Sequence, residues 1–261
     1  MKCKEIIESI ETVYQPGNAM DWDNVGLLVG DREAEVQTIL LAVDAADAVI
    51  EQAVSLGADM IITHHPMIFR GMKRITAEDF IGRRVLKLAQ NGIACYAMHT
   101  NFDVGDMGFA AAEKIRMQKQ EILEITGEAD GKTLGIGVKG ELPEAMTVLR
   151  AAEFVKQVFA IENVRIFGEP EHMVKRAAIV PGSGGTEIQY ALEAGAEVMI
   201  TGDIDHHEGL DAVAQGLHII DAGHFGLEHI FTDFMEAFLE ERLDGKVGIK
   251  KAREAAPYVV V

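Results

Sequence analysis

Three short motifs in this sequence gather the residue types that bind metal ions. The first is IITHHPMIF (61–69), in which His64 and His65 stand side by side where an apolar run ends. Pro66 limits His65 to extended conformations, and a turn at this point would aim both imidazoles in one direction. A polar loop with two ordinary histidines is the alternative interpretation.

The second motif, HTNFDVG (99–105), offers Asp103 as a hard oxygen ligand. His99 and Asn101 stand beside it, where they could orient ligand side chains. Taken alone, Asp103 is also a suitable N-cap for a helix that begins near Gly105. The motif therefore supports a metal site only in combination with the others.

The third motif, AGHFGLEHI (222–230), places His224 and Glu228 four residues apart at the start of an amphipathic helix. This spacing puts both side chains on one face, the usual way in which a helix presents two metal ligands; an incidental polar pair is the alternative. These motifs together offer five imidazole and carboxylate ligands, more than a single tetrahedral zinc site needs. A mixed set of this size suits two divalent ions such as zinc, iron or manganese. The predicted ligands are His64, His65, Asp103, His224 and Glu228.

The elements that must position these motifs follow an α/β pattern. Short apolar runs alternate with helical periodicity, which is typical of βα units and a largely parallel sheet. Strands are predicted at 38–43, 60–63 and 93–97, and helices at 45–55 and 81–90. Each metal-binding motif then lies at the carboxyl end of a predicted strand or directly after the turn that follows it.

The second half of the chain repeats the first. LGADMIIT (56–63) matches AGAEVMIT (194–201), and NGIACYAMHT (91–100) matches QGLHIIDAGH (215–224). The sequence therefore predicts an α/β fold of two related lobes, an internal duplication with the metal site between them. The expected bounds are 1–120 for the first α/β repeat, 121–170 for a β-α-β insert and 171–261 for the second repeat, packed as one compact unit.

Charge and composition restrict the partners. The 261 residues carry a formal charge of -18, from 42 acidic against 24 basic side chains, which argues against nucleic acid and anionic membranes. No window approaches 18 uninterrupted apolar residues, and the N-terminus is typical of an amphipathic helix rather than a signal peptide, so a cytoplasmic protein is expected. A small anionic ligand is compatible with this charge where metal ions or a basic loop reverse the local field.

Five segments, taken in order, resemble the motifs of the Nif-three-like family, also known as GTP cyclohydrolase I type 2 homologues. They are DNVGLLVG (23–30), ITHHPMIF (62–69), HTNFD (99–103), TGDIDHHE (201–208) and GHFGLE (223–228). The resemblance implies a two-lobed α/β fold, a toroidal homohexamer and a dinuclear metal site inside the ring. The family's ligands fall on the same five residues. The chain lacks the large central insertion of some members and resembles a minimal version.

Other residues have supporting roles in this interpretation. Arg70, Lys73 and Arg74 of FRGMKR (69–74) are expected to bind an anionic substrate, with a solvated charge run as the alternative. His99 is the predicted proton shuttle, and Asn101, His206 and His207 are expected to orient the ligands. Trp22 and Asp23 are expected to fix a loop, and PGSGG (181–185) to form an anion-binding turn or a tight connection.

Two functions are compatible with these residues. The first is a metal-dependent hydrolase acting on a nucleotide or related small molecule, with GTP ring opening, as the family label suggests, as one example. The second is a non-catalytic oligomeric metal-binding scaffold or regulatory interaction protein. Turnover by the metal-loaded protein, lost in a His65→Ala variant, would distinguish the enzyme from the scaffold.

Overall fold

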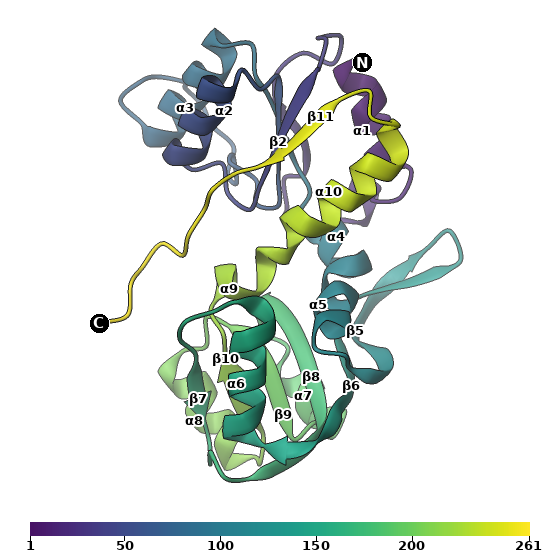
Figure 1. Cartoon of the computed structure of the whole chain (residues 1–261), viewed down its shortest axis with the longest axis vertical. Helices are drawn as coiled ribbons and strands as arrows, with labels where there is room; N and C mark the ends of the chain where they lie inside the picture. Colours follow the sequence, from purple (N-terminus) through teal and green to yellow (C-terminus); the bar gives the residue numbers. More distant parts are fainter. The chain divides into compact units, whose positions relative to one another are not determined.

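The computed structural model describes residues 1–261, which divide into two compact units. The first unit contains Met1–Phe102 and Phe231–Ala255, and the second contains Asp103–Ile230 and Ala256–Val261. Each unit is a sheet flanked by helices, so the predicted α/β fold of two lobes is confirmed (Figure 1). None of the helices combines the length and apolarity that a membrane crossing needs.

The first unit is built on a five-stranded sheet with the order β1-β4-β3-β2-β11. Its strands are β1 (Gly26–Val29), β2 (Thr38–Ala42), β3 (Met60–Thr63), β4 (Ala94–Ala97) and β11 (Gly248–Lys251). Strand β1 runs antiparallel to β4, and the other neighbours are parallel. The helices are α1 (Cys3–Glu11), α2 (Asp47–Leu56), α3 (Phe80–Gln90), α4 (Thr100–Phe102) and α10 (Ile230–Leu243), with a short 3-10 turn at Pro16–Asn18.

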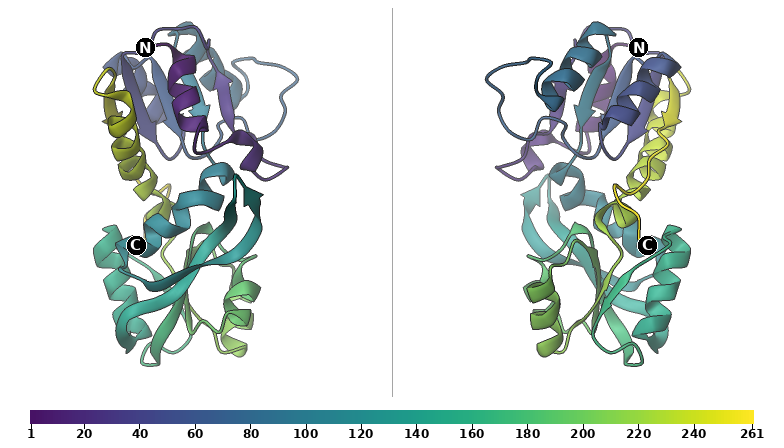
Figure 2. Two further views of the ribbon diagram at one scale, coloured as in Figure 1. Left: turned by 90° about the vertical axis from the view of Figure 1, so that its right-hand side faces the viewer. Right: turned by 90° about the vertical axis from the view of Figure 1, so that its left-hand side faces the viewer.

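Helices cover both faces of this sheet, α2 and α3 on one side and α1 and α10 on the other (Figures 1 and 2). The parallel strands are therefore largely apolar on both faces, and β3 (MIIT) is buried along its whole length. Leu40, Ile61 and Cys95 pack with Val49 of α2 and Val85 of α3 in one core cluster. Alternate residues of the same strands point to the opposite face, which follows from the two-residue period of a strand.

The second unit is built on a six-stranded sheet with the order β5-β6-β8-β9-β10-β7. Its strands are β5 (Gln118–Ala129), β6 (Lys132–Thr147), β7 (Arg165–Phe167), β8 (Met173–Ser183), β9 (Val198–Gly202) and β10 (His218–Asp221). Strands β8, β9 and β10 are parallel. The helices are α5 (Gly108–Lys114), α6 (Val148–Phe159), α7 (Ile188–Glu193), α8 (His206–Ala214) and α9 (His224–Glu228), and a π-helical stretch covers Asp103–Met107.

The two units share one arrangement, which agrees with the internal duplication expected from the sequence. The order α1-β1-β2-α2-β3-α3-β4 in the first unit corresponds to α6-β7-β8-α7-β9-α8-β10 in the second. The sheet order β1-β4-β3-β2 likewise matches β7-β10-β9-β8, each with an antiparallel strand at one edge. In each unit the carboxyl ends of three parallel strands lie along one edge of the sheet, the usual location of ligand sites in such sheets.

The bounds of the repeats differ from the predicted ones. The second copy begins with α6 at Val148 rather than at residue 171, and the insert is the β5–β6 hairpin rather than a β-α-β segment at 121–170. Residues 231–255 return to the first unit, so that unit is formed by two separate stretches of the chain. There β11 pairs with β2 in parallel, with Lys250 opposite Leu40.

Candidate metal-binding residues in each unit

The carboxyl ends of β3 and β4 bring three histidines of the first unit together. One ring nitrogen from each of His64, His65 and His99 lies within 4.8 Å of the other two. His64 is fully buried, and its Nδ1 donates a hydrogen bond to the carbonyl of Met98 at 2.8 Å. The predicted His64–His65 turn is therefore present, and it places both rings beside His99.

His65 is oriented by the loop that follows β2. Its Nδ1 lies 3.0 Å from Oδ1 of Asp44. The backbone N–H groups of Val43 and Asp44 donate to the two carboxylate oxygens of Glu254 at 2.8 and 3.0 Å, which fixes this loop from the C-terminal segment. Burial raises the pKa of Glu254, although these two hydrogen bonds oppose the shift. The hydrogen bond between Val43 and Glu254, which are 211 positions apart in the sequence, thus helps to fix the position of Asp44.

His99 is held by Asp23. Its Nδ1 lies 2.9 Å from Oδ1 of Asp23, and the backbone N–H and hydroxyl of Thr100 donate to Oδ2 at 2.9 and 2.6 Å. The Asp23 side chain is fully buried, and burial acts to raise its pKa. The hydrogen bonds from His99 and Thr100 outweigh burial and hold the pKa of Asp23 well below its usual range. Asp23 is therefore ionised at neutral pH and orients the ring of His99.

His224 and Glu228 form the second group of candidate ligands, on the second unit. Both belong to α9, as predicted, and Nε2 of His224 lies 3.0 Å from Oε2 of Glu228. Nδ1 of His224 lies 2.9 Å from Oδ2 of Asp203, the residue that follows β9. Glu228 is 3% exposed, so a carboxylate lies almost buried beside an imidazole. Such a pair is a ready ligand set for a divalent cation.

Two glycines allow α9 to pack closely on the strand ends. A side chain at Gly182, of the PGSGG turn, would place its Cβ 2.6 Å from Oε1 of Glu228. A Cβ at Gly202 would lie 2.5 Å from the backbone nitrogen of His224. The PGSGG turn therefore serves as a tight connection against α9, which favours that interpretation over an anion-binding turn.

Asp221, the last residue of β10, organises the loops around these ligands. Its carboxylate accepts hydrogen bonds from the backbone nitrogens of Ile204 at 3.1 Å and Gly223 at 2.9 Å. It also pairs with Arg165 of β7. Because Ile204 follows Asp203 and Gly223 precedes His224, one buried carboxylate fixes both loops.

The four histidines share a hydrogen-bonding pattern that suits metal binding. In each ring Nδ1 faces an oxygen acceptor, either the Met98 carbonyl or a carboxylate. A carbonyl or an ionised carboxylate can only accept, so in His64, His65 and His99 Nδ1 carries the proton and the lone pair of the neutral ring is on Nε2. In His224 both ring nitrogens face carboxylates, Nδ1 that of Asp203 and Nε2 that of Glu228, so its tautomer is not fixed in this way. Metal-binding histidines show this arrangement, in which the outer partner fixes the tautomer and ring orientation. The donor chemistry thus fits a divalent metal in both units.

Asp103, the fifth predicted ligand, lies in the second unit. Asp103 is half-buried and begins the π-helical stretch Asp103–Met107, after the chain has already turned helical at Thr100. It is therefore not the N-cap of a helix near Gly105, and π-helical stretches are frequent at functional sites.

Three residues expected to orient the ligands have other surroundings. Asn101 is buried, and its side-chain amide donates to the carbonyl of Tyr14 at 3.0 Å, which anchors the N-terminal segment. His206 and His207 are exposed in the first turn of α8 after the N-cap Asp205, because that turn faces solvent. The carboxylates of Asp44, Asp23 and Asp203 orient the rings instead. Asp23 was expected only to fix a loop and Asp203 lies in the TGDIDHHE motif, whereas Asp44 stands outside every motif and gave no signal in the sequence.

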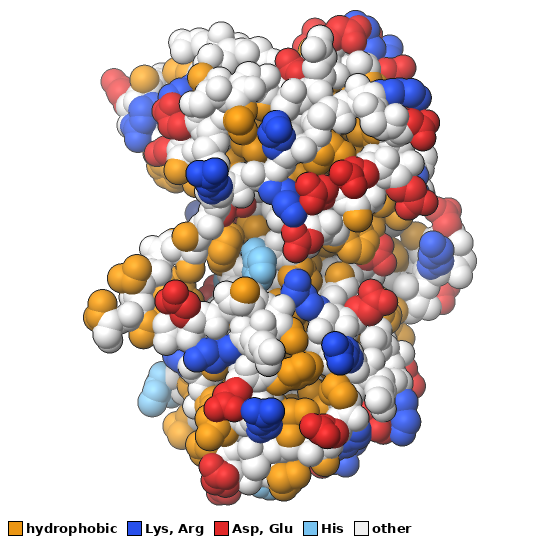
Figure 3. All heavy atoms as spheres, viewed as in Figure 1, with side chains coloured by type: hydrophobic (Ala, Val, Ile, Leu, Met, Phe, Trp, Pro, Cys, Tyr) orange, Lys and Arg blue, Asp and Glu red, His pale blue; other side chains and the backbone are white.

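Arg70, Lys73 and Arg74 are all exposed on the loop that follows the His64–His65 turn. None of the three forms an ion pair, whereas basic residues such as Arg84 and Lys251 are paired with carboxylates. On the face shown in Figure 3, acidic and basic side chains are intermingled, so the net negative charge does not form one patch there. The loop is a local group of unneutralised positive charge in an acidic chain.

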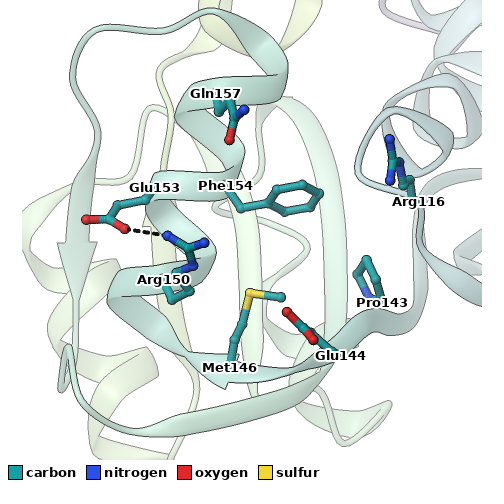
Figure 4. A pocket seen from close by; sticks show the side chains of 8 residues that line it. All are labelled: Arg116, Pro143, Glu144, Met146, Arg150, Glu153, Phe154 and Gln157. Carbon is teal, nitrogen blue, oxygen red and sulfur yellow. Dashed lines mark hydrogen bonds and ion pairs between the residues drawn. The ribbon is translucent and has the colours of Figure 1, made fainter.

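A surface pocket in the second unit has a different character. It encloses about 220 Å³ and is lined by α6 and the end of β6 (Figure 4). Phe154 and Met146 form its apolar part, and Arg150 is neutralised by Glu153 at 3.3 Å. The pocket is smaller than a usual ligand site and contains no histidine, so it offers no further candidate for metal binding.

Comparison with known proteins gives matches over nearly the whole chain. A family model described as Duf34/NIF3 (NGG1p interacting factor 3) matches residues 1–256. A Clostridium perfringens protein named GTP cyclohydrolase 1 type 2 homolog is 37% identical, covering 98% of this chain and 97% of that protein. A crystal structure of a Bacillus cereus protein related to NIF3 has a TM-score of 0.94 at 26% identity, covering 100% of this chain and 99% of that one. Reduced HcgD from Methanocaldococcus jannaschii has a TM-score of 0.81 at 29% identity, covering 96% and 97%.

Proposed function

Because this chain belongs to the Duf34/NIF3 family, we propose that it is a divalent-metal-binding protein that hydrolyses a nucleotide or a related small molecule. In this proposal two ions of zinc, iron or manganese are held by the five predicted ligands. These are His64, His65, Asp103, His224 and Glu228.

One observation carries the proposal. The Nδ1 atoms of His64 and His65 donate to a backbone carbonyl and a carboxylate, so their Nε2 atoms are prepared to bind a cation, and Nε2 of His224 lies 3.0 Å from Oε2 of Glu228, a second pair of ligand atoms. Ordinary histidines of a polar loop have no reason to share one tautomer. The near-burial of His64 and Glu228 also favours a cation, because a buried carboxylate beside imidazoles is stabilised by positive charge.

The chain's own residues supply the remaining parts of a hydrolytic site. Bound divalent ions lower the pKa of water and polarise the bond that is attacked. His99 is held by an ionised Asp23, which favours the Nδ1-protonated ring and stabilises the ring once Nε2 accepts a proton. His99 is thus suited to take a proton from water. The names of the relatives point to a guanine nucleotide as substrate, and the unpaired Arg70, Lys73 and Arg74 suit its phosphates.

The test begins with metal content. Reconstituted wild-type protein should bind about two divalent ions per chain, and His65→Ala and Glu228→Ala should each bind fewer. His206→Ala, which removes an exposed histidine outside both groups, is the matched control. A content of about half an ion or less in folded wild type would contradict the dinuclear proposal.

Activity is tested separately, on a panel of nucleotides and phosphoesters that includes GTP. Turnover by metal-loaded wild type that is lost in His65→Ala supports the hydrolase. Nucleotide binding without turnover would instead support the metal-binding scaffold. A His99→Ala variant that keeps its metal but loses turnover would support the proton-transfer role of His99.

We also propose that the chain assembles as a homohexameric ring, on the family resemblance alone. The assembly requires apolar contact surfaces that can outweigh repulsion between chains of charge -18. Light scattering over a wide concentration range should give the mass of six chains. A monomer at all concentrations would refute the ring.

A further inference from the structure

Two exposed aromatic side chains lie beside the histidines of the first unit. Trp22 is 59% exposed and Phe69 is 50% exposed, with ring centroids 5.8 Å apart and planes inclined by 50°. The rings of Trp22 and His99 also form a T-shaped pair, with a centroid distance of 5.8 Å. Trp22 therefore packs beside the residue proposed to move protons, and Phe69 packs against Trp22.

Polar contacts of neighbouring residues hold this pair in place. Asp23, next to Trp22, is buried under His99 and Thr100. Asn24 donates from its side-chain amide to the carbonyl of Ile68, next to Phe69, at 2.5 Å. The two loops are thus joined beside the rings, while the rings themselves stay open to solvent. Exposed aromatic area of this size is unfavourable in water and becomes favourable when a ligand covers it.

The charge next to the pair restricts what that ligand can be. Phe69 is followed at once by Arg70, and Lys73 and Arg74 complete the unpaired basic loop. A flat apolar surface next to unneutralised guanidinium and ammonium groups suits a molecule with a planar ring at one end and an anionic group at the other. A nucleotide has this chemistry, since every base offers a π-face that stacks on aromatic side chains.

We propose that Trp22 and Phe69 form a stacking surface for the base of a nucleotide whose phosphate is bound by the 69–74 loop. This inference deepens the proposed function by assigning two residues to recognition of the base. Binding itself does not depend on the proposed function; only the hydrolysis that would follow binding does. Stacking next to His99 would bring the bound molecule to the three histidines, which explains why aromatic area is left exposed there.

Fluorescence gives a direct measurement, because Trp22 is the single tryptophan of the chain. Titration with guanosine 5′-monophosphate should quench Trp22 emission, and guanosine should do so at higher concentration. Ribose 5-phosphate, which has no aromatic base, should bind by calorimetry with little quenching. Measuring both metal-loaded and metal-free protein separates this inference from the metal-dependent reaction, because stacking needs no metal.

Variants make the test specific. Phe69→Leu and Trp22→Leu should weaken binding of guanosine 5′-monophosphate by about fivefold or more, measured by calorimetry, and leave ribose 5-phosphate unchanged. Phe80→Leu is the matched control, because Phe80 is 52% exposed and faces Arg84 instead.

Three outcomes would overturn the inference. The first is that guanosine 5′-monophosphate fails to bind in either metal state, and the second is that the variants bind it as wild type does. The third is that Trp22→Leu or Phe69→Leu changes the mass found by light scattering, since the pair would then be a contact between copies of the chain. Metal content and turnover, measured as above, would still test the proposed function in each case.

Discussion

Replacing Gly182 with alanine should weaken metal binding by displacing Glu228. The new Cβ would lie 2.6 Å from Oε1 of Glu228, whereas ordinary van der Waals contact begins near 3.4 Å. Either the carboxylate or the turn must therefore move by about 0.8 Å, because neither atom can be compressed. We expect a displacement of this size to reduce metal affinity about as much as removing a residue that orients a ligand. Zinc affinity should therefore fall by about 10-fold or more.

Backbone strain must be separated from the steric effect. Gly182 has a φ of +82°, and alanine in a left-handed conformation costs roughly 1–2 kcal/mol by itself. Gly57, which ends α2 with a φ of +62°, is the matched control, because a Cβ added there would meet nothing within 4 Å. Gly57→Ala should lower the free energy of unfolding by a similar strain, yet leave zinc affinity unchanged.

The assay is zinc competition against a chelating indicator, together with urea unfolding of the metal-free variants. The expected result is a comparable loss of stability in both variants and a loss of zinc affinity in Gly182→Ala alone. Equal zinc affinity in the two variants would refute the reasoning, because the contact with Glu228 would then have no part in metal binding.

Three further predictions follow from the same contacts. Asp203→Asn should lower zinc affinity about 10–100-fold by loosening His224, whereas Asp205→Asn, which keeps the cap of α8, should leave zinc titrations unchanged. Because the pKa of Asp23 is lowered on folding, its stabilisation is complete above its ordinary pKa of 3.8 and is lost as pH falls below it. The difference in unfolding free energy between wild type and Asp23→Asn, measured in urea, should therefore shrink below about pH 4; a constant difference would contradict the assignment. Single alanine variants of Arg70, Lys73 or Arg74 should weaken ribose 5-phosphate binding in calorimetry about tenfold, while Lys87→Ala, whose ammonium is paired with Glu51, should not.

The sequence contained enough information to locate the strand ends that carry ligands. The apolar run Met60–Ile62, followed by Thr63, predicted β3 with its observed bounds, because a strand buried on both faces is apolar at successive positions. The four-residue spacing of His224 and Glu228 predicted their shared helical face, and the pair is 3.0 Å apart. Both predictions rest on local periodicity, which tertiary packing did not override.

Long-range pairing could not be predicted in the same way. Strand β11 has the sequence GIKK and is mostly exposed, so no apolar pattern indicates a strand or its partner β2. The contact of Glu254 with the loop at Asp44 depends on that pairing, so it could not be predicted from the sequence either. The π-helical stretch at Asp103 likewise depends on backbone hydrogen bonding that residue type does not specify.

The internal duplication could not have identified Asp44 and Asp203 as the residues that orient His65 and His224. Asp44 follows β2 in the first unit, whereas Asp203 follows β9, the counterpart of β3, so the two are not equivalent positions of the repeat. At the end of β3 the first copy carries His64 and His65, and at the end of β9 the second copy carries Gly202 and Asp203.

The two copies thus share a framework and differ in its chemistry. The first unit offers three imidazoles, each held by a carbonyl or carboxylate, and the second offers an imidazole and a nearly buried carboxylate. Imidazole-rich ligand sets suit zinc and iron, and added carboxylate oxygen favours harder ions such as manganese. Because the two copies kept the strand ends and differ in the side chains that follow them, the shared fold accounts for the location of the candidate ligands, and the residues that differ between the copies would determine which metal each group prefers.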